Sequence, residues 1–394
     1  MTKFSGLDHY RQRYPALASK AYFNFGGQGP MAQETLSAIA HAHAHYQQIG
    51  PFSNAANSWI GQELAETKQA IAAELGISPR TLTLTENVLV GCNIPLWGLD
   101  WQPGDHIVMS DCEHPGVVAT LLELKHRFQI EISTCSLLKT LNEGDPVAEI
   151  RQHLHPKTRM VVISHILWNT GQVLPLTEIV NACHAYTAER GGVLVHVDAA
   201  QSVGVLPLNL PETGVDFYAF TGHKWLCGPA GIGGLYVSPA ALETIRPTYI
   251  GWRGITKDET GYPTGWESDG RRFEVSTSDF ALLSALRQAI ALHRQWGTAE
   301  ERYQRMCQLS DRLWHQLKDI PRIHCLKSSP PASGLVSFTV DDRSHADLVR
   351  TLESKRYMLR TLLHPDCVRA CVHYFTSESE IDELAATLRS LLAS

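Results

Sequence analysis

The sequence predicts an α/β fold with a mostly parallel, doubly wound sheet and a smaller α+β domain at the C-terminal end. Short apolar runs rich in β-branched residues alternate with helical segments up to about residue 245, and this order is typical of parallel sheets. Near residue 250 the pattern changes to a helical block and then a strand between helices. We expect an arm over 1–20 that packs with the small domain, a large domain over 21–255 and a small domain over 256–394.

The elements follow in a simple order. A glycine-rich stretch ending at Pro30 leads into a helix from Gln33. The predicted strands of the large domain are LTLT (82–85), DHIVMS (105–110), EISTCSL (131–137), RMVVISHI (159–166), GVLVHVDAA (192–200), VDFYAFTG (215–222) and GIGGLYVS (231–238). The polar, glycine-rich segment 252–272 has no periodicity and predicts a long functional loop. Beyond it we expect a helical block over 279–319, a strand over 334–342, and helices over 345–357 and 379–392.

Composition excludes several classes of protein. The chain has 394 residues of ordinary globular composition, which excludes disorder. Its 34 Lys and Arg face 40 Asp and Glu, a formal net charge of -6, so we expect neither nucleic acid nor a membrane surface as a partner. No apolar run approaches the ~18 residues of a membrane span, and the first residues lack the apolar core of a signal peptide. We therefore expect a cytoplasmic protein.

Cysteines and histidines give weak signals. The nine cysteines are irregularly spaced without a CxxC motif, which predicts reduced thiols. The HAHAHY segment places His41 and His45 on one face of a predicted helix, with His43 between them. No carboxylate or cysteine lies beside them, so we expect an exposed helix and no metal, with a zinc site as the alternative.

Two predicted strands end in residues that carry chemistry. The segment VLVHVDAAQ (193–201) contains a buried strand that ends in Asp198, and Gln201 follows three residues later. A carboxylate at a buried strand end needs a cationic partner, although a helix cap is the alternative. The next strand ends in Thr221, followed by His223, Lys224 and a glycine loop. A lysine in this place is poorly exposed to solvent, and glycines let a ligand approach the backbone; the alternative is an ordinary surface lysine.

Together these residues suggest pyridoxal phosphate (PLP) as the cofactor. PLP needs a lysine for its aldehyde and an acid for its pyridine nitrogen, which Lys224 and Asp198 supply. Thr85 lies at a strand-to-helix turn where backbone N–H groups can hold a phosphate, or it merely caps the helix. His114 follows another strand and has a flat ring suited to stacking on the pyridine, or it merely fills a loop.

Longer motifs resemble one enzyme family. The segment DAAQSVGVLPLNLP, followed by VDFYAFTGHKWLCGPAGIGGLYV, is similar to the signature of class V aminotransferase-fold PLP enzymes, the cysteine desulfurase relatives. EHPGVV (113–118) resembles the family's stacking-histidine segment. RRFEVSTSD (271–279) resembles a segment whose threonine, here Thr277, reaches the phosphate of the other subunit, so the resemblance implies a homodimer with a shared active site. It also implies that Glu86, Gln201, Thr221 and His223 contact the cofactor, and that Arg360 and Arg369 bind the substrate carboxylate.

One departure from the family bears on the reaction. Desulfurases of this family carry a sulfur-accepting cysteine on a long loop, whereas only eight residues separate Arg360 from Arg369 here. Cys367 lies in this gap with little freedom to move, and we interpret it as a structural thiol, with sulfur acceptor as the alternative. The pattern then resembles the L-cysteine/L-cystine C–S lyases of this fold. Among SHILWNTGQ (164–172), either Trp168 or Asn169 contacts the cofactor.

The resemblance to C–S lyases implies a mechanism and partners. Lys224 removes the Cα proton of cystine, or more weakly of cysteine, and the sulfur leaves. The products are pyruvate, ammonia and a persulfide or sulfide, and an apo iron–sulfur protein is a possible sulfur recipient. The alternatives are a cysteine desulfurase or another activity of this fold, such as an amino-acid epimerase.

Overall fold

The computed structural model describes residues 6–393, so residues 1–5 of the predicted arm and Ser394 lie outside the described residues. The helices are α1 Leu7–Arg11, α2 Gln33–Gln48, α3 Asn54–Leu75, α4 Val88–Gly98, α5 Pro115–Phe128, α6 Pro146–Gln152, α7 Leu176–His184, α8 Leu210–Thr213, α9 Ala281–Trp296, α10 Ala299–Lys318, α11 His345–Ser354 and α12 Glu378–Ala393. The strands are β1 Ala21–Tyr22, β2 Leu82–Thr85, β3 His106–Ser110, β4 Glu131–Cys135, β5 Thr158–Ser164, β6 Thr187–Ala188, β7 Gly191–Gly192, β8 Leu194–Asp198, β9 Phe217–Thr221, β10 Gly233–Val237, β11 Ile255–Lys257, β12 Pro263–Trp266, β13 Ile323–Cys325, β14 Leu335–Val340, β15 Tyr357–Met358, β16 Arg360–Leu363 and β17 Asp366–Cys371.

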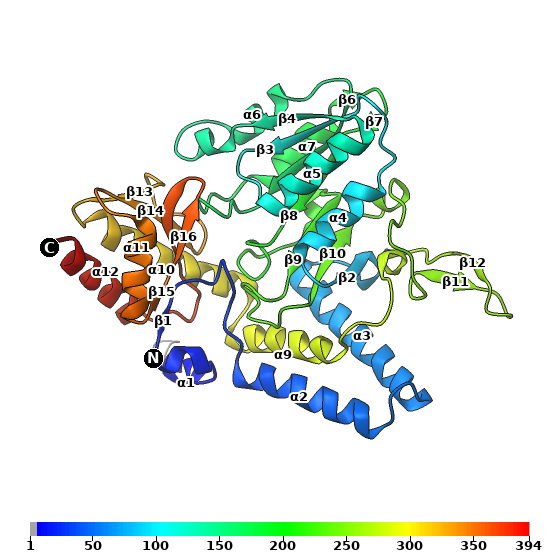
Figure 1. Cartoon of the computed structure of the whole chain (residues 1–394), viewed down its shortest axis with the longest axis horizontal. Coiled ribbons are helices and arrows are strands. Elements are labelled where there is room, and N and C mark those ends of the chain that lie inside the picture. Colours follow the sequence, from blue (N-terminus) through cyan, green and yellow to red (C-terminus); the bar gives the residue numbers. More distant parts are fainter. Residues whose placement is uncertain (1–5, 394) are drawn as a thin grey trace.

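A seven-stranded sheet in the order β2-β10-β9-β8-β5-β3-β4 forms the centre of the large domain (Figure 1). Strand β10 is antiparallel to both of its neighbours, and the pairs from β9 to β4 are parallel. These strands are those that the alternating apolar runs predict. The predicted mostly parallel α/β fold is therefore confirmed.

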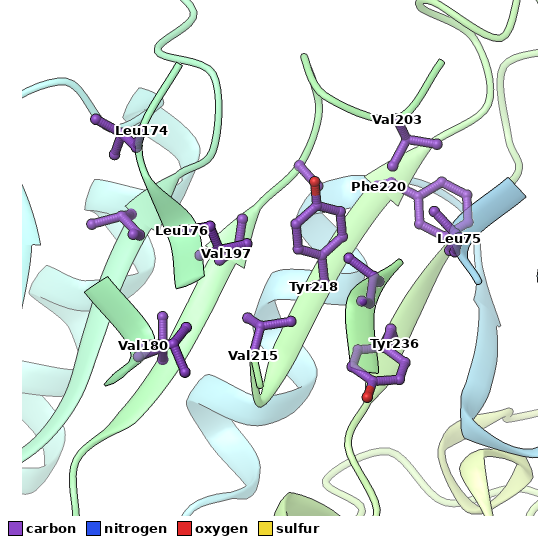
Figure 2. Packing of buried hydrophobic residues seen from close by; sticks show 14 of the residues in the cluster. Leu75, Leu174, Leu176, Val180, Val197, Val203, Val215, Tyr218, Phe220 and Tyr236 are labelled. Carbon is purple, nitrogen blue, oxygen red and sulfur yellow. The ribbon is translucent and has the colours of Figure 1, made fainter. Parts of the chain in front are cut away.

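Helices cover both faces of this sheet. Along β9, Phe217 and Ala219 face a core with α4 and α5, whereas Tyr218 and Phe220 face a core with α3, α7 and α9. Figure 2 shows the second core, where Tyr218 and Phe220 lie among aliphatic side chains such as Val197. Because both faces are buried, inner strands such as β9 carry apolar residues toward both faces, whereas the edge strand β4 carries polar ones as well.

The small domain is a four-stranded antiparallel sheet with helices α10, α11 and α12 (Figure 1). Its strand order is β13-β14-β17-β16, and its core includes Phe338, Val368 and Leu388. Strand β17 lies inside this sheet, so Val368 and Arg369 have register partners on both neighbouring strands.

The predicted long loop over 252–272 is wrong in one respect, because it contains the hairpin β11–β12. Ile255 pairs with Trp266, and the Asp258 side chain accepts backbone N–H bonds from Thr260 and Tyr262 in the turn. The hairpin projects from the large domain (Figure 1), and most of its residues are exposed. With neither face buried, the sequence has no reason to carry the apolar alternation that predicts a strand.

The described part of the arm contacts the small domain. Arg11 donates to the Phe375 carbonyl (2.7 Å) and pairs with Glu380 (2.6 Å), and Tyr10 lies 2.8 Å from the Tyr374 hydroxyl. Beyond the expected boundary at 255, helix α9 packs against α3, where Arg287 pairs with Glu63. The division into arm, large and small domains remains a prediction. None of the helices within residues 6–393 combines the length and apolarity needed to cross a membrane.

Candidate active site

Three parallel strands end at one edge of the large sheet. Strand β8 ends at Asp198, and Ser164 at the end of β5 is its register partner. Strand β9 ends at Thr221, and the following turn carries His223 and Lys224. In open α/β sheets, ligands bind in the crevice outside this edge, at the point where the strand order reverses.

A cavity of about 360 Å³ opens at this edge, next to the small domain. The predicted site residues that line it are His114, Asp198, Gln201, His223, Lys224, Arg360 and Arg369. Its other lining residues are Gly26, Gly27, Asn87, Val88, Leu89, Ser164, Ile166, Trp168 and Ala200. The structure thus brings together side chains from the whole length of the chain.

Lys224 lines the cavity, and the pKa of its amine is lower than that of an ordinary lysine. Burial lowers the pKa of Lys224 to about 8, and the positive charges of Arg369 and Arg360 act in the same direction. The nearby Asp198 carboxylate opposes this effect. A lysine of lowered pKa is neutral in a substantial fraction of molecules near pH 8, and the neutral amine is the reactive form.

The buried Asp198 side chain contacts the backbone of the following turn and also faces the cavity. One carboxylate oxygen accepts the Ala200 N–H at 2.9 Å, which closes a turn and caps no helix, because the next helix, α8, begins at Leu210. The same side chain lines the cavity that holds Lys224. The turn contact and a role toward a ligand are therefore compatible in this structure.

Gln201 and the histidines are held by protein groups. Gln201 donates to the Gly26 carbonyl (3.0 Å) and accepts the Trp225 indole N–H (2.8 Å), so it ties the glycine-rich stretch to the residue after Lys224. His114 Nδ1 accepts the Gly116 N–H (3.1 Å), and burial lowers the pKa of its ring, which favours the neutral form. His223 Nδ1 lies 2.6 Å from the buried Thr221 hydroxyl.

The two arginines differ in exposure. Arg369 is 2% exposed, and its Nη1 donates to the Trp168 carbonyl at 2.7 Å. Its Nε is buried without a hydrogen-bond partner within the described part of the chain. Arg360 is exposed and lines the same cavity. A buried guanidinium with an unsatisfied N–H is suited to a carboxylate ligand, because such a ligand would complete its hydrogen bonds.

Four predicted site residues do not line this cavity, and one of them, Thr221, contacts it only through His223. Thr85, Glu86 and Thr277 line a neighbouring pocket of about 340 Å³. The Thr85 hydroxyl donates to the Asn87 carbonyl at 3.0 Å. Thr277 is thus beside the strand-to-helix turn of β2 and α4, and it is not among the residues that line the cavity of Lys224.

Sequence reasoning missed or left open several cavity residues. Ser164 lies two residues before the end of the predicted strand 159–166 and ends the observed strand β5, so the rule that ligands gather at carboxyl ends was a signal for it. Val88 and Leu89 begin α4, and their apolar side chains gave no signal, because only their backbone position matters. Trp168 lines the cavity, whereas the Asn169 amide donates to the His364 carbonyl at 3.0 Å.

The described cysteines and the three histidines of α2 lie outside this cavity. Cys367 is fully buried in β17, and burial raises the pKa of its thiol to about 12. Among residues 6–393, no cysteine lines the cavity. His41, His43 and His45 are exposed on α2, and over the same range no three His, Cys, Asp or Glu side chains cluster in a way that could hold a metal.

The sheet, the second domain and the lysine–aspartate pair at neighbouring strand ends define the fold type I architecture of PLP-dependent enzymes. A profile of the family described as aminotransferase class-V matches residues 22–388. The chain belongs to this family.

Solved structures and curated relatives narrow the comparison. The chain is 51% identical, with a TM-score of 0.94, to the cystine C–S lyase C-DES in complex with its reaction product cysteine persulfide, over 95% of this chain and 99% of that one. It is 50% identical, over 96% of this chain and 98% of the other, to a lysine-to-alanine variant of C-DES with glycine covalently linked to the PLP cofactor, at the same TM-score of 0.94. Isopenicillin N epimerase of Streptomyces clavuligerus is 26% identical, over 93% of this chain and 94% of its own length. A probable cysteine desulfurase of Methanothermobacter thermautotrophicus is 25% identical, over 98% of both chains.

Proposed function

We propose that this protein is a PLP-dependent C–S lyase that cleaves L-cystine, and L-cysteine more weakly. The observation that carries the proposal is the cavity that joins Lys224, Asp198 and His114 to the arginine pair Arg360 and Arg369. The likeness to C-DES over nearly the whole chain supports the same reaction. For cystine, one water is consumed, and the products are pyruvate, ammonia and cysteine persulfide.

The residues of the cavity fit PLP. The first N–H groups of a helix have no partner within the helix, so the start of α4 at Val88 and Leu89 offers donors for a phosphate. Asp198 supplies a buried negative charge for a protonated pyridine nitrogen. Lys224 supplies an amine of lowered pKa for an aldehyde. His114 lines the cavity with a ring that we propose stacks on the pyridine, and Gln201, Thr221 and His223 support it.

When bound, PLP supplies an aldehyde for the substrate amine and a ring that accepts electrons. Arg369, and Arg360 beside it, bind the substrate carboxylate. The Lys224 amine takes the Cα proton, which it can do near neutral pH because burial keeps a fraction of it uncharged. The bond between Cβ and sulfur then breaks, and the sulfur leaves with its electron pair. A persulfide is a weaker base than a thiolate, so cystine should react faster than cysteine.

A thiol that accepts sulfur is what a desulfurase needs and what this cavity lacks among the described residues. Cys367 lies in the middle of the small-domain sheet, paired with Leu362 across the strands. It cannot move over a substrate without breaking β17. This favours elimination over the desulfurase alternative.

We also propose a homodimer with a shared active site. Thr85, Glu86 and Thr277 share a pocket next to the cavity, and large apolar side chains between 249 and 275 are exposed there or nearby: Tyr249, Ile250, Trp252, Tyr262, Trp266 and Val275. Exposed apolar groups of this size are typical of an interface. In such a dimer Thr277 would serve the partner's phosphate.

The persulfide product would be a source of sulfur for iron–sulfur assembly, with an apo iron–sulfur protein as recipient. The cytosol remains the proposed compartment, because all nine cysteines are free thiols.

The direct experiment measures pyruvate and sulfane sulfur with cystine and cysteine side by side. We expect one pyruvate per persulfide from cystine and a slower reaction with cysteine. Alanine and a persulfide bound to the protein, in place of pyruvate, would establish the desulfurase reaction instead. Racemised cystine without pyruvate would establish an epimerase.

A further inference from the structure

Glu113 is a buried acid beside the cavity that the proposed reaction does not use. It lies in the loop between β3 and α5, next to His114, and is 6% exposed. Its Oε1 accepts the Ser164 backbone N–H at 3.0 Å and the Ser110 hydroxyl, and its Oε2 lies 2.9 Å from the Ser164 hydroxyl oxygen. All of these partners are neutral, so the hydrogen bonds that the described residues make to Glu113 bring no compensating positive charge.

A second carboxylate lies close to Glu113. Ser164, which Glu113 contacts through both its backbone and its side chain, is the register partner of Asp198 on the adjacent strand. Two buried carboxylates so close together cannot both ionise cheaply, because like charges repel strongly away from water. Asp198 faces the positive charge of Lys224, whereas Glu113 has neutral partners, so Glu113 is the carboxyl that stays protonated.

The other titratable groups around Glu113 include three thiols, Cys92 on α4, Cys135 on β4 and Cys112 on the same loop. The loop also carries His114, whose ring pKa is lowered by burial, and Asp111, which accepts hydrogen bonds from Ser136 and Leu138. Burial raises the pKa of each of these thiols, so all of them are neutral. Burial likewise raises the pKa of Glu113 to about 8, with the Asp198 charge acting in the same direction and the serine hydrogen bonds opposing it.

We propose that Glu113 is a positioning residue that remains uncharged and donates a hydrogen bond to the Ser164 hydroxyl oxygen. This bond turns the Ser164 hydroxyl hydrogen toward the cavity and leaves Asp198 as the single buried negative charge among the described residues there.

The hydrogen bonds of the loop fix which oxygen carries the proton. The Ser110 oxygen accepts the Cys112 N–H at 3.1 Å, so its own hydrogen is free to donate to Glu113 Oε1. Oε1 therefore receives two donors, and the proton resides on Oε2. The atom within reach of Oε2 is the Ser164 oxygen, and Ser164 lines the cavity. A neutral acid can serve as a donor in this way when its site disfavours the charge.

Only the effect of Glu113 on catalysis rests on the proposed function, whereas its charge state does not. The test therefore has two independent readouts. The first is the urea midpoint of the full-chain enzyme between pH 4.5 and 9 for the parent, Glu113→Gln and Glu113→Leu. A carboxyl whose folded-state pKa is raised contributes stability at low pH that is lost as pH rises from its ordinary 4.5 to about 8. The parent should lose stability relative to Glu113→Gln across this window, by up to about tenfold in the unfolding constant per pH unit.

The second readout is the visible absorption and turnover of the PLP-loaded enzyme. Gln is neutral and can still donate to Ser164, so Glu113→Gln should keep the parent's spectrum and kcat at pH 7. Leu is neutral but cannot donate, so Glu113→Leu should shift the absorption band and lower kcat about tenfold. Glu63→Gln is the matched control, because Glu63 is a buried glutamate paired with Arg287. It should lower stability across the whole pH range, since Arg287 keeps only its ion pair with Glu66 and Ser284 loses a charged acceptor.

Two results would overturn the proposal. A Glu113→Gln variant less stable than the parent by the same factor at every pH would show that Glu113 is charged. A Glu113→Leu variant with the parent's spectrum and kcat would show that the bond to Ser164 positions nothing. If the parent itself takes up no PLP, the proposed function fails, while the urea comparison still decides the charge of Glu113.

Discussion

Arg360 and Arg369 are register partners in the antiparallel ladder of β16 and β17, and both line the cavity that contains Lys224. Opposed residues of such a ladder point to the same face of the sheet, so the short connection between the strands brings two positive charges to one wall. Arg360 is exposed and Arg369 is buried, so one arginine lies toward the opening of the cavity and the other toward its interior. Like charges in this position are unfavourable alone and suit an anionic substrate.

Lys224→Ala should abolish turnover and the covalent attachment of PLP, because no other amine lines the cavity within residues 6–393. Absorption spectra and pyruvate assays check this. Lys355→Ala, at an exposed site in the small domain, is the control and should behave as the parent. Near-parent turnover by Lys224→Ala would contradict the assignment of the lysine.

Arg369→Ala should keep the cofactor absorption but weaken substrate binding. Loss of a hydrogen bond to a charged group costs about 1.5–3 kcal/mol, which should appear mainly in KM for cystine. Initial rates over a range of cystine concentrations check this. Arg350→Ala, which removes a surface ion pair with Asp347, should leave KM unchanged. An unaltered KM in Arg369→Ala would remove Arg369 from the substrate site.

Cys367→Ala should release pyruvate from cystine at close to the parent rate, because the thiol is packed inside the small-domain sheet. Its stability cost should be about 1 kcal/mol. Pyruvate assays and urea unfolding measure both, and Cys325→Ala, at another small-domain thiol, is the control. A folded, PLP-loaded Cys367→Ala without activity would replace elimination by the desulfurase reaction.

The attachment of PLP to the apoenzyme should become faster with rising pH, reach half of its maximum rate near pH 8 and level off above that. The neutral amine is the reactive form, and its fraction saturates above the lowered pKa of Lys224, about 8. Absorbance changes on mixing apoenzyme with PLP between pH 6.5 and 9.5 follow the rate. Arg360→Gln removes a positive charge that lowers this pKa, so its midpoint should move to higher pH. A rate still rising steeply at pH 9.5 in the parent would indicate an ordinary lysine.

The active enzyme should sediment as a dimer, because Thr277 lies outside the cavity of its own chain. Thr277→Ala should weaken PLP binding by about 1 kcal/mol, the value of one hydrogen bond. Thr351→Ala, whose hydroxyl bonds within its own helix, is the control for the titration. An active monomer at assay concentration would exclude a shared site.

The sequence by itself determined the order of strands and helices and the chemistry of the strand ends. Apolar runs predict strands wherever both faces of the sheet are buried, and Asp198 and Lys224 stand out because their charges follow such runs. The exposed hairpin β11–β12 left no such pattern, since solvent on both faces imposes no alternation.

Tertiary structure alone decided which residues share the cavity. Trp168 and not Asn169 lines it, Thr277 lies in the neighbouring pocket, and Ser164 enters through its position opposite Asp198. The charge state of Glu113 likewise depends on partners 51 residues away along the chain. Pairing of distant strands sets these distances, and local propensity carries no record of them, because a strand's own residues are the same whichever neighbour it has.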